Sequence, residues 1–201
     1  MVAEARRATV EHGLTGFTIE QLCESVGVSR RTFFNHFASK EDVVLGIELN
    51  ADVETLTAYA AGQLVPVSLD PLASIVALAI EQLRIVGLNR ADEVLVRKVF
   101  DREPALVARF LSATDVQLAK VTAAVRERFG WTVSDDPRAR LVTEAAAGLL
   151  RVTAEHYFDD DFDEATGPTF DALLTTNLRL MRAAITTGPT VSASVDQENT
   201  P

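Results

Sequence analysis

The sequence predicts an all-α protein, and three observations support this. Nearly every long segment carries apolar side chains at helical intervals, and almost none alternates as a strand does. Proline and glycine interrupt these segments, among them Pro66, Pro71, Gly87 and Gly130. The chain has 201 residues, of which 47% are hydrophobic, so one large or two small domains can bury a core.

A short helix is expected before Phe17, and a more strongly marked one follows it. Thr18 and Gln21 have the spacing of a capping box, in which each side chain accepts a hydrogen bond from the other residue's backbone N–H. Apolar residues at helical spacing follow as far as Val26. Gly27 should end this helix, because glycine readily adopts the left-handed conformation found at helix C-termini.

The next helix has two different faces. Ser29 is placed to cap it, and Phe33 and Phe37, four residues apart, share a face that should pack inward. Arginine and asparagine make two-point contacts with guanine and adenine edges, and threonine can contact a thymine methyl. Such residues make this pattern typical of a helix-turn-helix that binds duplex DNA. The outward face and its flanks carry these side chains: Arg30, Arg31, Thr32, Phe34, Asn35 and His36.

The charge of this region supports the same interpretation. The whole chain has a net charge of −10, yet the stretch from Ser29 to Lys40 contains three basic residues and no carboxylate. A basic helix in an acidic protein indicates a polyanionic partner, and so small a basic footprint favours a dimer, which doubles the phosphate contacts. The alternative is a solvated basic face on an ordinary small helical domain.

These residues resemble those of a known family. The segment GVSRRTFFNHFASKEDVV, with TIEQL before it, is similar to the DNA-binding region of the TetR family of transcriptional regulators. The resemblance implies that Thr18, His36 and Lys40 lie against phosphates. It also implies that the helix capped by Ser29 enters the major groove, with these residues facing the bases: Arg30, Arg31, Thr32, Phe34 and Asn35.

The resemblance also implies a domain organisation. We expect an N-terminal three-helix helix-turn-helix DNA-binding domain over residues 1–46 and a C-terminal helical ligand-binding and dimerisation domain over residues 47–187. Residues 188–201 are small and polar, and we expect a disordered tail there. Dimeric proteins of this kind bind half-sites about one DNA turn, ~34 Å, apart or multiples of it.

Two departures from the family pattern leave an alternative open. The family usually has tyrosine where this chain has Phe34, so a hydrogen bond to DNA is lost at that position. The first helix is also shorter than usual, and the basic arm before it is missing. The alternative function is therefore a helical small-molecule-binding dimer with weak or lost DNA binding.

Helical spacing continues through the rest of the chain. Ser39 should cap a helix that runs from Lys40 to about Leu64. In the helix after Pro104, one apolar seam is expected, traced by Val107, Leu111, Thr114, Leu118, Val121 and Val125. The later helices are expected over these ranges: Leu72 to about Val86, about Ala91 to Arg102, Pro104 to Phe129, Pro137 to about Phe158, and about Pro168 to Ile185.

The last two long helices carry small residues, which permit close approach of two backbones. In the TetR family the corresponding helices of two subunits form a four-helix dimer interface. The alternative is that these residues pack inside one subunit. The candidates for a homodimer interface are Ala145, Gly148, Leu149, Val152, Leu174, Leu178 and Met181.

The middle helices are expected to enclose a pocket for a small-molecule effector. The segments VRKVFDREPALVARFLSATDVQLAKVTAAVRERFG and DDPRARLVTEAAAGLLRVTAEHYF resemble the ligand domain of the mycofactocin-system regulator group of actinobacteria, which implies an apolar or acyl-CoA-like ligand. Ligand and operator would then compete, so that the protein is a repressor relieved by its ligand. The candidate pocket residues, each of which could instead be ordinary core, are Leu83, Phe100, Phe110 and Val125.

The sequence gives no support for an enzyme. His12, His36 and His156 are isolated from one another and from Cys23, without metal-ligand spacing, so we expect neither a metal nor another cofactor. Cys23 falls on an apolar stripe and is expected to be a small core residue. No segment has the length of a membrane span and no signal-peptide pattern opens the chain, so we expect a cytoplasmic protein without a membrane partner.

Overall fold

The structure, a computed structural model, describes residues 1–49, 52–86, 90–131, 133, 136–159, 161–162 and 166–186. Within these ranges every regular element is helical, as predicted, including one 3-10 turn at Leu14–Gly16. The α-helices are α1 Val2–His12, α2 Ile19–Val26, α3 Arg30–His36, α4 Lys40–Leu45, α5 Val53–Ala60, α6 Pro71–Val86, α7 Arg90–Arg102, α8 Ala105–Arg128, α9 Arg138–Tyr157 and α10 Phe170–Thr186.

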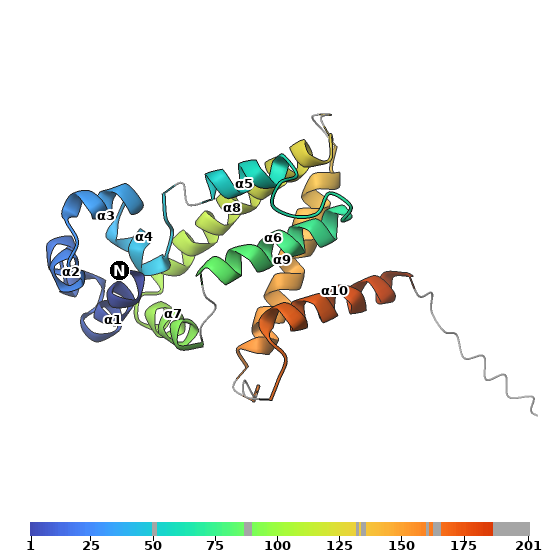
Figure 1. Cartoon of the computed structure of the whole chain (residues 1–201). Coiled ribbons are helices and arrows are strands. Elements are labelled where there is room, and N and C mark those ends of the chain that lie inside the picture. Colours follow the sequence, from blue (N-terminus) through green and yellow to red (C-terminus); the bar gives the residue numbers. More distant parts are fainter. Residues whose placement is uncertain are drawn as a thin grey trace, which may run out of the picture.

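The helices form two groups that are joined by α7 and α8 (Figure 1). Helices α1 to α4 lie together at one end of the molecule, and we call them the head. Helix α7 packs against α1, whereas the long helix α8 reaches from α4 along α5 to α9. Helices α6 and α10 pack on α9 at the other end, and we call α5 to α10 the body.

The head is anchored to the body through a shared hydrophobic core. Phe33 and Phe37 of the head are almost fully buried, and they share a cluster with Val99 of α7 and Leu106 of α8. The backbone N–H of Leu14 also donates a hydrogen bond to the Glu103 carboxylate, at 2.8 Å. Because this core crosses the boundary predicted at residue 46, the orientation of the head depends on α7 and α8.

Two further clusters stabilise the body. Tyr59 of α5 is fully buried between α6 and α8, and its hydroxyl lies 2.7 Å from that of Ser74. Burial raises the pKa of this phenol. The third cluster joins α6, α9 and α10 around Leu174, which is fully buried.

The prediction of a single helix from Lys40 to about Leu64 is wrong, because the structure has two helices there. Helix α4 ends at Leu45, because Gly46 adopts a left-handed backbone (φ 76°) and the N–H of Ile47 donates to the Asp42 carbonyl. Helix α5 begins at Val53. A connector therefore separates the two helices, and four of its described residues line the groove described below: Gly46, Ile47, Glu48 and Asp52.

The apolar seam predicted along the helix after Pro104 is only partly covered. Its residues are half-buried or buried from Leu118 onward and exposed before it. Val125 of α8 is fully buried, whereas Val107 and Leu111 near its start are exposed, and so is Thr114. Within the described chain the first half of this helix packs mainly through Leu106, on a different face from the seam. Helical spacing identified the helix correctly but did not determine which part of its surface is covered.

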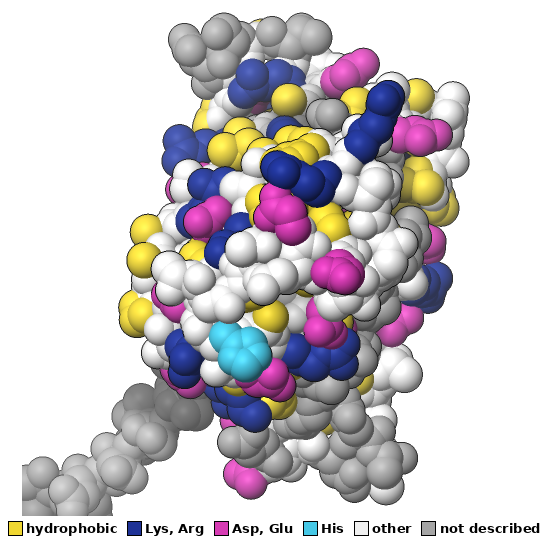
Figure 2. All heavy atoms as spheres, turned by 90° about the vertical axis from the view of Figure 1, so that its left-hand side faces the viewer, with side chains coloured by type: hydrophobic (Ala, Val, Ile, Leu, Met, Phe, Trp, Pro, Cys, Tyr) yellow, Lys and Arg dark blue, Asp and Glu magenta, His cyan; other side chains and the backbone are white. Residues whose placement is uncertain are grey.

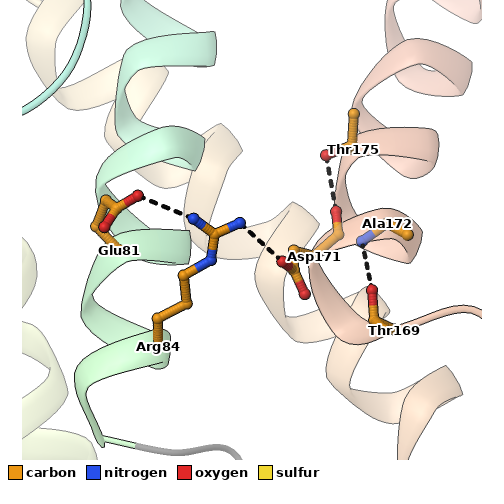
Figure 3. A network of polar contacts seen from close by, with 6 residues as sticks. All are labelled: Glu81, Arg84, Thr169, Asp171, Ala172 and Thr175. Carbon is orange, nitrogen blue, oxygen red and sulfur yellow. Dashed lines mark hydrogen bonds and ion pairs between the residues drawn. The ribbon is translucent and has the colours of Figure 1, made fainter.

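An ion-pair network joins α6 to the start of α10. Arg84 donates to Glu81 on its own helix at 3.2 Å and to Asp171 of α10 at 3.1 Å (Figure 3). The Thr169 hydroxyl accepts a hydrogen bond from the N–H of Ala172 and so caps this end of α10. Arg182 forms a second ion pair, with Asp70 before α6. These contacts fix α10 against α6.

No helix of the described part of the chain combines the length and apolar character needed to cross a membrane. The tail predicted over residues 188–201 lies outside the described residues.

Candidate nucleic-acid interface

The two ends of α2 are fixed by the residues that the sequence indicated. Thr18 Oγ1 accepts a hydrogen bond from the Gln21 N–H at 3.2 Å, and Gln21 Oε1 accepts one from the Thr18 N–H at 2.8 Å. Gly27 has a left-handed backbone (φ 70°), and the N–H of Val28 donates to the Cys23 carbonyl. The predicted capping box and glycine stop are confirmed.

Helix α3 follows directly and is held by its aromatic residues. Ser29 Oγ accepts a hydrogen bond from the Thr32 N–H at 3.0 Å, which confirms the predicted cap. Phe33 and Phe37 pack in the core with Leu22 and Cys23 of α2. This packing determines which face of α3 is turned outward.

The outward face of α3 is the predicted one. Phe34 is 43% exposed and its ring makes an edge-to-face contact with buried Phe33, at a centroid distance of 5.1 Å. An exposed aromatic supported from beneath is available to a binding partner at no cost in core packing. The exposed side chains on and beside this face are Ser29, Arg30, Arg31, Phe34, Asn35 and His36, and Thr32 is half-buried.

Three of the polar residues on this face have different surroundings. Arg30 Nη1 lies 2.6 Å from Glu20 Oε1 of α2, and its guanidinium carbon lies 5.8 Å from the centre of the Phe34 ring. His36 Nδ1 lies 3.7 Å from a Glu48 oxygen. Arg31, in contrast, has no ion-pair partner in the described part of the chain.

Lys40 and Thr18, predicted to lie against phosphates, are brought together beside Phe17. Lys40 Nζ donates to the Phe17 carbonyl at 2.7 Å and lies 4.8 Å from the centre of the Phe17 ring. Thr18, the next residue, caps α2. The two therefore lie at the N-terminal end of α2, where backbone N–H groups and the helix dipole favour an anion.

The surface at this end of the molecule is not uniformly basic. Figure 2 views the molecule from the head, and basic and acidic side chains are interspersed over this face. Binding to DNA through this face would therefore depend on specific cations on α3, more than on a broad positive potential.

Comparison with known proteins agrees with this geometry. Residues 2–47 match the family model described as bacterial regulatory proteins, tetR family. The HTH-type transcriptional regulator TcmR of Streptomyces glaucescens is 29% identical over 182 residues, which cover 87% of this chain and 79% of that protein. Residues 2–47 form a TetR-family helix-turn-helix domain.

Two other relatives match shorter stretches of the chain. The HTH-type transcriptional repressor AcnR of Corynebacterium diphtheriae is 39% identical over 69 residues, 34% of this chain and 36% of that protein. The repressor AcnR of Corynebacterium glutamicum is 44% identical over 43 residues, 21% of this chain and 23% of that protein. Together these matches support a helix-turn-helix transcriptional regulator of the TetR type, and that family is not an enzyme family.

The predicted pocket residues do not line one cavity. Leu83 packs in the cluster of α6, α9 and α10, whereas Val125 is fully buried in the cluster around Tyr59. Phe100 and Phe110 contact each other, at a centroid distance of 5.5 Å, near the head. The four residues therefore do not line one pocket: Leu83 and Val125 belong to different clusters, and Phe110, 40% exposed, lines the groove described next.

A groove of about 560 Å³ lies between α8 and the connector after α4. Arg109 and Lys120 of α8 lie on its wall and pair with acidic residues opposite, Asp42 and Asp52. Glu48 adds a third carboxylate. The groove depends on the break at Gly46, which helical spacing does not predict. Its apolar lining residues are Leu45, Ile47, Phe110, Ala113 and Val116.

Three predicted dimer-interface residues are buried inside the protomer. Leu149, Leu174 and Leu178 are at most 7% exposed and form the core between α6, α9 and α10, so their assignment to an interface is corrected. Val152 is exposed, and three others are half-buried: Ala145, Gly148 and Met181. Exposed apolar residues that the sequence analysis did not select lie on the same two helices: Leu141, Leu180 and Ile185.

The described residues contain no group of three or more His, Cys, Asp or Glu side chains arranged to hold a metal ion. Cys23 is buried in the head, and burial raises the pKa of its thiol, which is the environment of a packing residue. The His156 ring contacts Phe162 edge to face.

Proposed function

We propose that this TetR-family regulator is a homodimeric repressor that binds an operator through α3 and leaves it when a small molecule binds the body. The observation that carries the proposal is the outward face of α3, where Arg30, Arg31 and Asn35 surround exposed Phe34 above a buried aromatic pair. Side chains of these types recognise base edges in the major groove. Since Phe33 and Phe37 fix the helix, that face is presented rigidly.

The phosphate contacts would come from around this helix. Lys40 and Thr18 lie side by side at the start of α2, and His36 lies at the end of α3. Contacts at both ends of the recognition helix set its register on the duplex but carry no sequence information. Sequence discrimination is then assigned to Arg30, Arg31, Thr32, Phe34 and Asn35, with Ser29 as their helix cap.

A homodimer is proposed from the apolar surface of α9 and α10. Leu141, Ala145, Gly148 and Val152 follow one another at intervals of four, three and four residues, so they share one face of α9. Exposed Leu180 and Ile185 of α10 extend the apolar surface. A two-fold pair through this surface would present two heads to two half-sites.

The groove between α8 and the connector is the proposed effector site. Its wall includes residues 45–48, and the next residue, Leu49, donates its N–H to the carbonyl of His36, the last residue of α3, at 2.7 Å. A ligand that displaces the connector would thus move the recognition helix. If the ligand and the operator favour different positions of the connector, each weakens the binding of the other.

The charges of the groove favour an uncharged apolar effector. The resemblance of the body to the mycofactocin-system regulator group supports an acyl-CoA-like ligand, which carries several phosphate charges. Arg109 and Lys120, the two cations of the groove, are already paired with carboxylates. Phosphates placed there would face Asp42, Glu48 and Asp52, so of the two ligand classes the groove supports the apolar one.

The first test is fluorescence anisotropy of the protein with duplexes from around its own gene, at several salt concentrations. We expect selective binding to one duplex that the Arg30→Ala/Arg31→Ala variant loses. A slope of log K against log salt should report the phosphate contacts. Lys98→Ala/Arg179→Ala, on α7 and α10, is the matched control, because both side chains are exposed, form no ion pair within the described residues and carry the same charge.

Absence of any selective duplex would contradict the repressor proposal and favour the alternative, a small-molecule-binding dimer without DNA binding. The observation that favours this alternative is Phe34, whose ring offers no hydrogen bond where the family usually has a tyrosine hydroxyl. A repressor of chromosomal genes would act in the cytoplasm, and we propose that location together with the function.

The groove has a separate test, with the neutral apolar dye Nile red as the probe. Ala113 lies on the groove wall, whereas Ala123 lies exposed on α8 outside the groove. Dye fluorescence should rise with the wild-type protein and with Ala123→Phe, and should fail to rise with Ala113→Phe, whose side chain fills the groove. Equal dye binding by both variants would contradict an effector site here.

A further inference from the structure

The ring of Phe34 is exposed on α3, yet its own helix holds it in place. Its edge-to-face contact with buried Phe33 has a centroid distance of 5.1 Å, and the two ring planes meet at 83°. The guanidinium carbon of Arg30, four residues earlier and on the same side of the helix, lies 5.8 Å from the centre of the Phe34 ring. A side chain fixed by two neighbours loses little rotamer freedom when it binds a partner.

The exposed part of this side chain can make apolar contacts alone. The ring is 43% exposed, on the face of α3 that also carries Arg30, Arg31 and Asn35. Unlike these polar neighbours, a phenylalanine ring has no hydrogen-bonding group, so it cannot pair with a phosphate or with the nitrogen and oxygen atoms of a base edge. Recognition through Phe34 therefore requires an apolar group on the DNA.

Among the base edges in the major groove, only thymine carries a methyl group, at C5. Covering that methyl with the ring removes apolar surface of both partners from water. The other bases lack the methyl, and the ring would separate their hydrogen-bonding atoms from water without replacing it. The contact thus favours thymine over each other base, whereas a cation against a phosphate favours none.

We propose that Phe34 is a specificity-determining residue that recognises the C5-methyl group of a thymine in each operator half-site. The inference rests on the proposed DNA-binding function of α3, and it names the chemical group that this position recognises. It also gives a use to the phenylalanine whose missing hydroxyl otherwise favours the alternative without DNA binding.

The test removes the methyl group from the DNA and leaves the base pairing in place. In the selected operator each thymine is replaced singly by deoxyuridine, which pairs with adenine in the same way but lacks the C5-methyl, and fluorescence anisotropy measures binding. Burial of one methyl group changes an equilibrium constant by about fourfold. We expect one such replacement in each half-site to weaken wild-type binding by that factor, and Phe34→Ala to bind both duplexes equally.

Two further variants of α3 separate a methyl contact from a general loss of affinity. Arg31→Ala removes an exposed cation, so it should weaken binding to the thymine and deoxyuridine duplexes alike and preserve their ratio. Thr32 also carries a methyl, and Thr32→Ser removes it while keeping the hydroxyl that lies 2.9 Å from Ser29 Oγ. We expect the ratio to survive in Thr32→Ser. Its loss there, and not in Phe34→Ala, would assign the thymine to Thr32 and overturn the inference.

Phe34→Leu and Phe34→Gln keep the test decisive if Phe34→Ala fails to fold. Leucine is apolar and should keep the preference for thymine, whereas glutamine is polar and should lose it. If no deoxyuridine replacement weakens wild-type binding, or if each weakens wild type and Phe34→Gln equally, the inference is wrong while the proposed function stands. If the wild-type protein selects no duplex, the proposed function and this inference both fail.

Discussion

The guanidinium of Arg109 on α8 holds the carboxylate of Asp42 on α4, with Nε and Nη2 2.8 and 2.6 Å from Oδ1. Asp42 is 5% exposed, so the carboxylate is a buried charge. Arg109 Nη2 also donates to Ser39 Oγ, the cap of α4, at 3.3 Å. One body residue therefore fixes the start of the helix that follows the recognition helix.

Arg109→Leu is expected to destabilise the protein by about 1–2 kcal/mol, because it leaves a buried carboxylate without its cation. The loss stays this small because the Arg109 side chain is 46% exposed and water can partly replace it. Urea denaturation measures the change. Adding Asp42→Asn should restore part of the loss, since a neutral amide is less costly to bury than an unpaired carboxylate. An additive double variant would contradict this account.

The break between α4 and α5 gives a second prediction. Gly46→Ala should lower the free energy of unfolding by more than Gly27→Ala, although both glycines have a left-handed backbone. A Cβ at Gly27 would meet nothing within 4 Å, so we expect the backbone cost alone, about 1 kcal/mol. A Cβ at Gly46 would also lie 3.3 Å from the Arg6 guanidinium.

Urea denaturation and far-UV circular dichroism together check this pair of variants. A rise in helical content with unchanged stability for Gly46→Ala would mean that α4 and α5 can join. That result would agree with the single helix predicted from Lys40 to about Leu64.

What the sequence predicted correctly in the head depends on neighbouring residues. Thr18, Ser29 and Gly27 act within three or four positions of themselves, so their spacing alone identifies the caps and the stop of α2. The inward position of Phe33 and Phe37 follows in the same way from helical geometry. The resemblance to the family then supplied the DNA-binding role that spacing alone could not distinguish from a solvated face.

What the sequence did not predict depends on residues far apart in the chain. Leu83 and Val125 have the same apolar character, but different helices bury them in different clusters. Leu174 belongs to an apolar face of α10, and periodicity does not say whether α6 or a second subunit covers that face. The pair of Glu20 and Arg30 was missed because it requires the angle between α2 and α3.

A third prediction concerns pH. The hydrogen bond from Arg84 and that from its own backbone N–H lower the pKa of Asp171. A carboxyl group whose pKa is lower in the folded state stabilises the fold above its unfolded value of about 3.9, and that contribution is lost as pH falls through the folded value. Arg84→Gln should therefore destabilise the protein at pH 7, and the difference from wild type should vanish in strong acid.

The effect should stay below about 1 kcal/mol, because the Arg84 and Asp171 side chains are 61% and 41% exposed. Urea denaturation from pH 7 down to about pH 2 shows how the difference is lost across the titration of aspartate. Arg179→Gln, which removes the same charge from α10, should show no such pH dependence. A difference between Arg84→Gln and wild type that persists unchanged at every pH would exclude Asp171 as its source.

The last prediction separates the proposed dimer from the fold of the protomer. Gly148 lies on the proposed face of α9, and a Cβ there would meet nothing within 4 Å. Gly148→Leu should therefore leave the protomer folded and even raise its stability, because leucine favours helix over glycine by nearly 1 kcal/mol. In a dimer the same side chain would hold two α9 helices apart, so we expect dissociation.

Sedimentation equilibrium over a range of concentrations measures that dissociation. Val152→Glu should also dissociate the dimer, by burying a charge in its interface, whereas Val67→Glu, at a more exposed valine in the loop before α6, should not. Monomeric Gly148→Leu should bind a two-half-site operator far more weakly than wild type, since one head supplies half the contacts. If Gly148→Leu and Val152→Glu both remain dimeric, this face is not the interface, and the two heads must be paired through another surface.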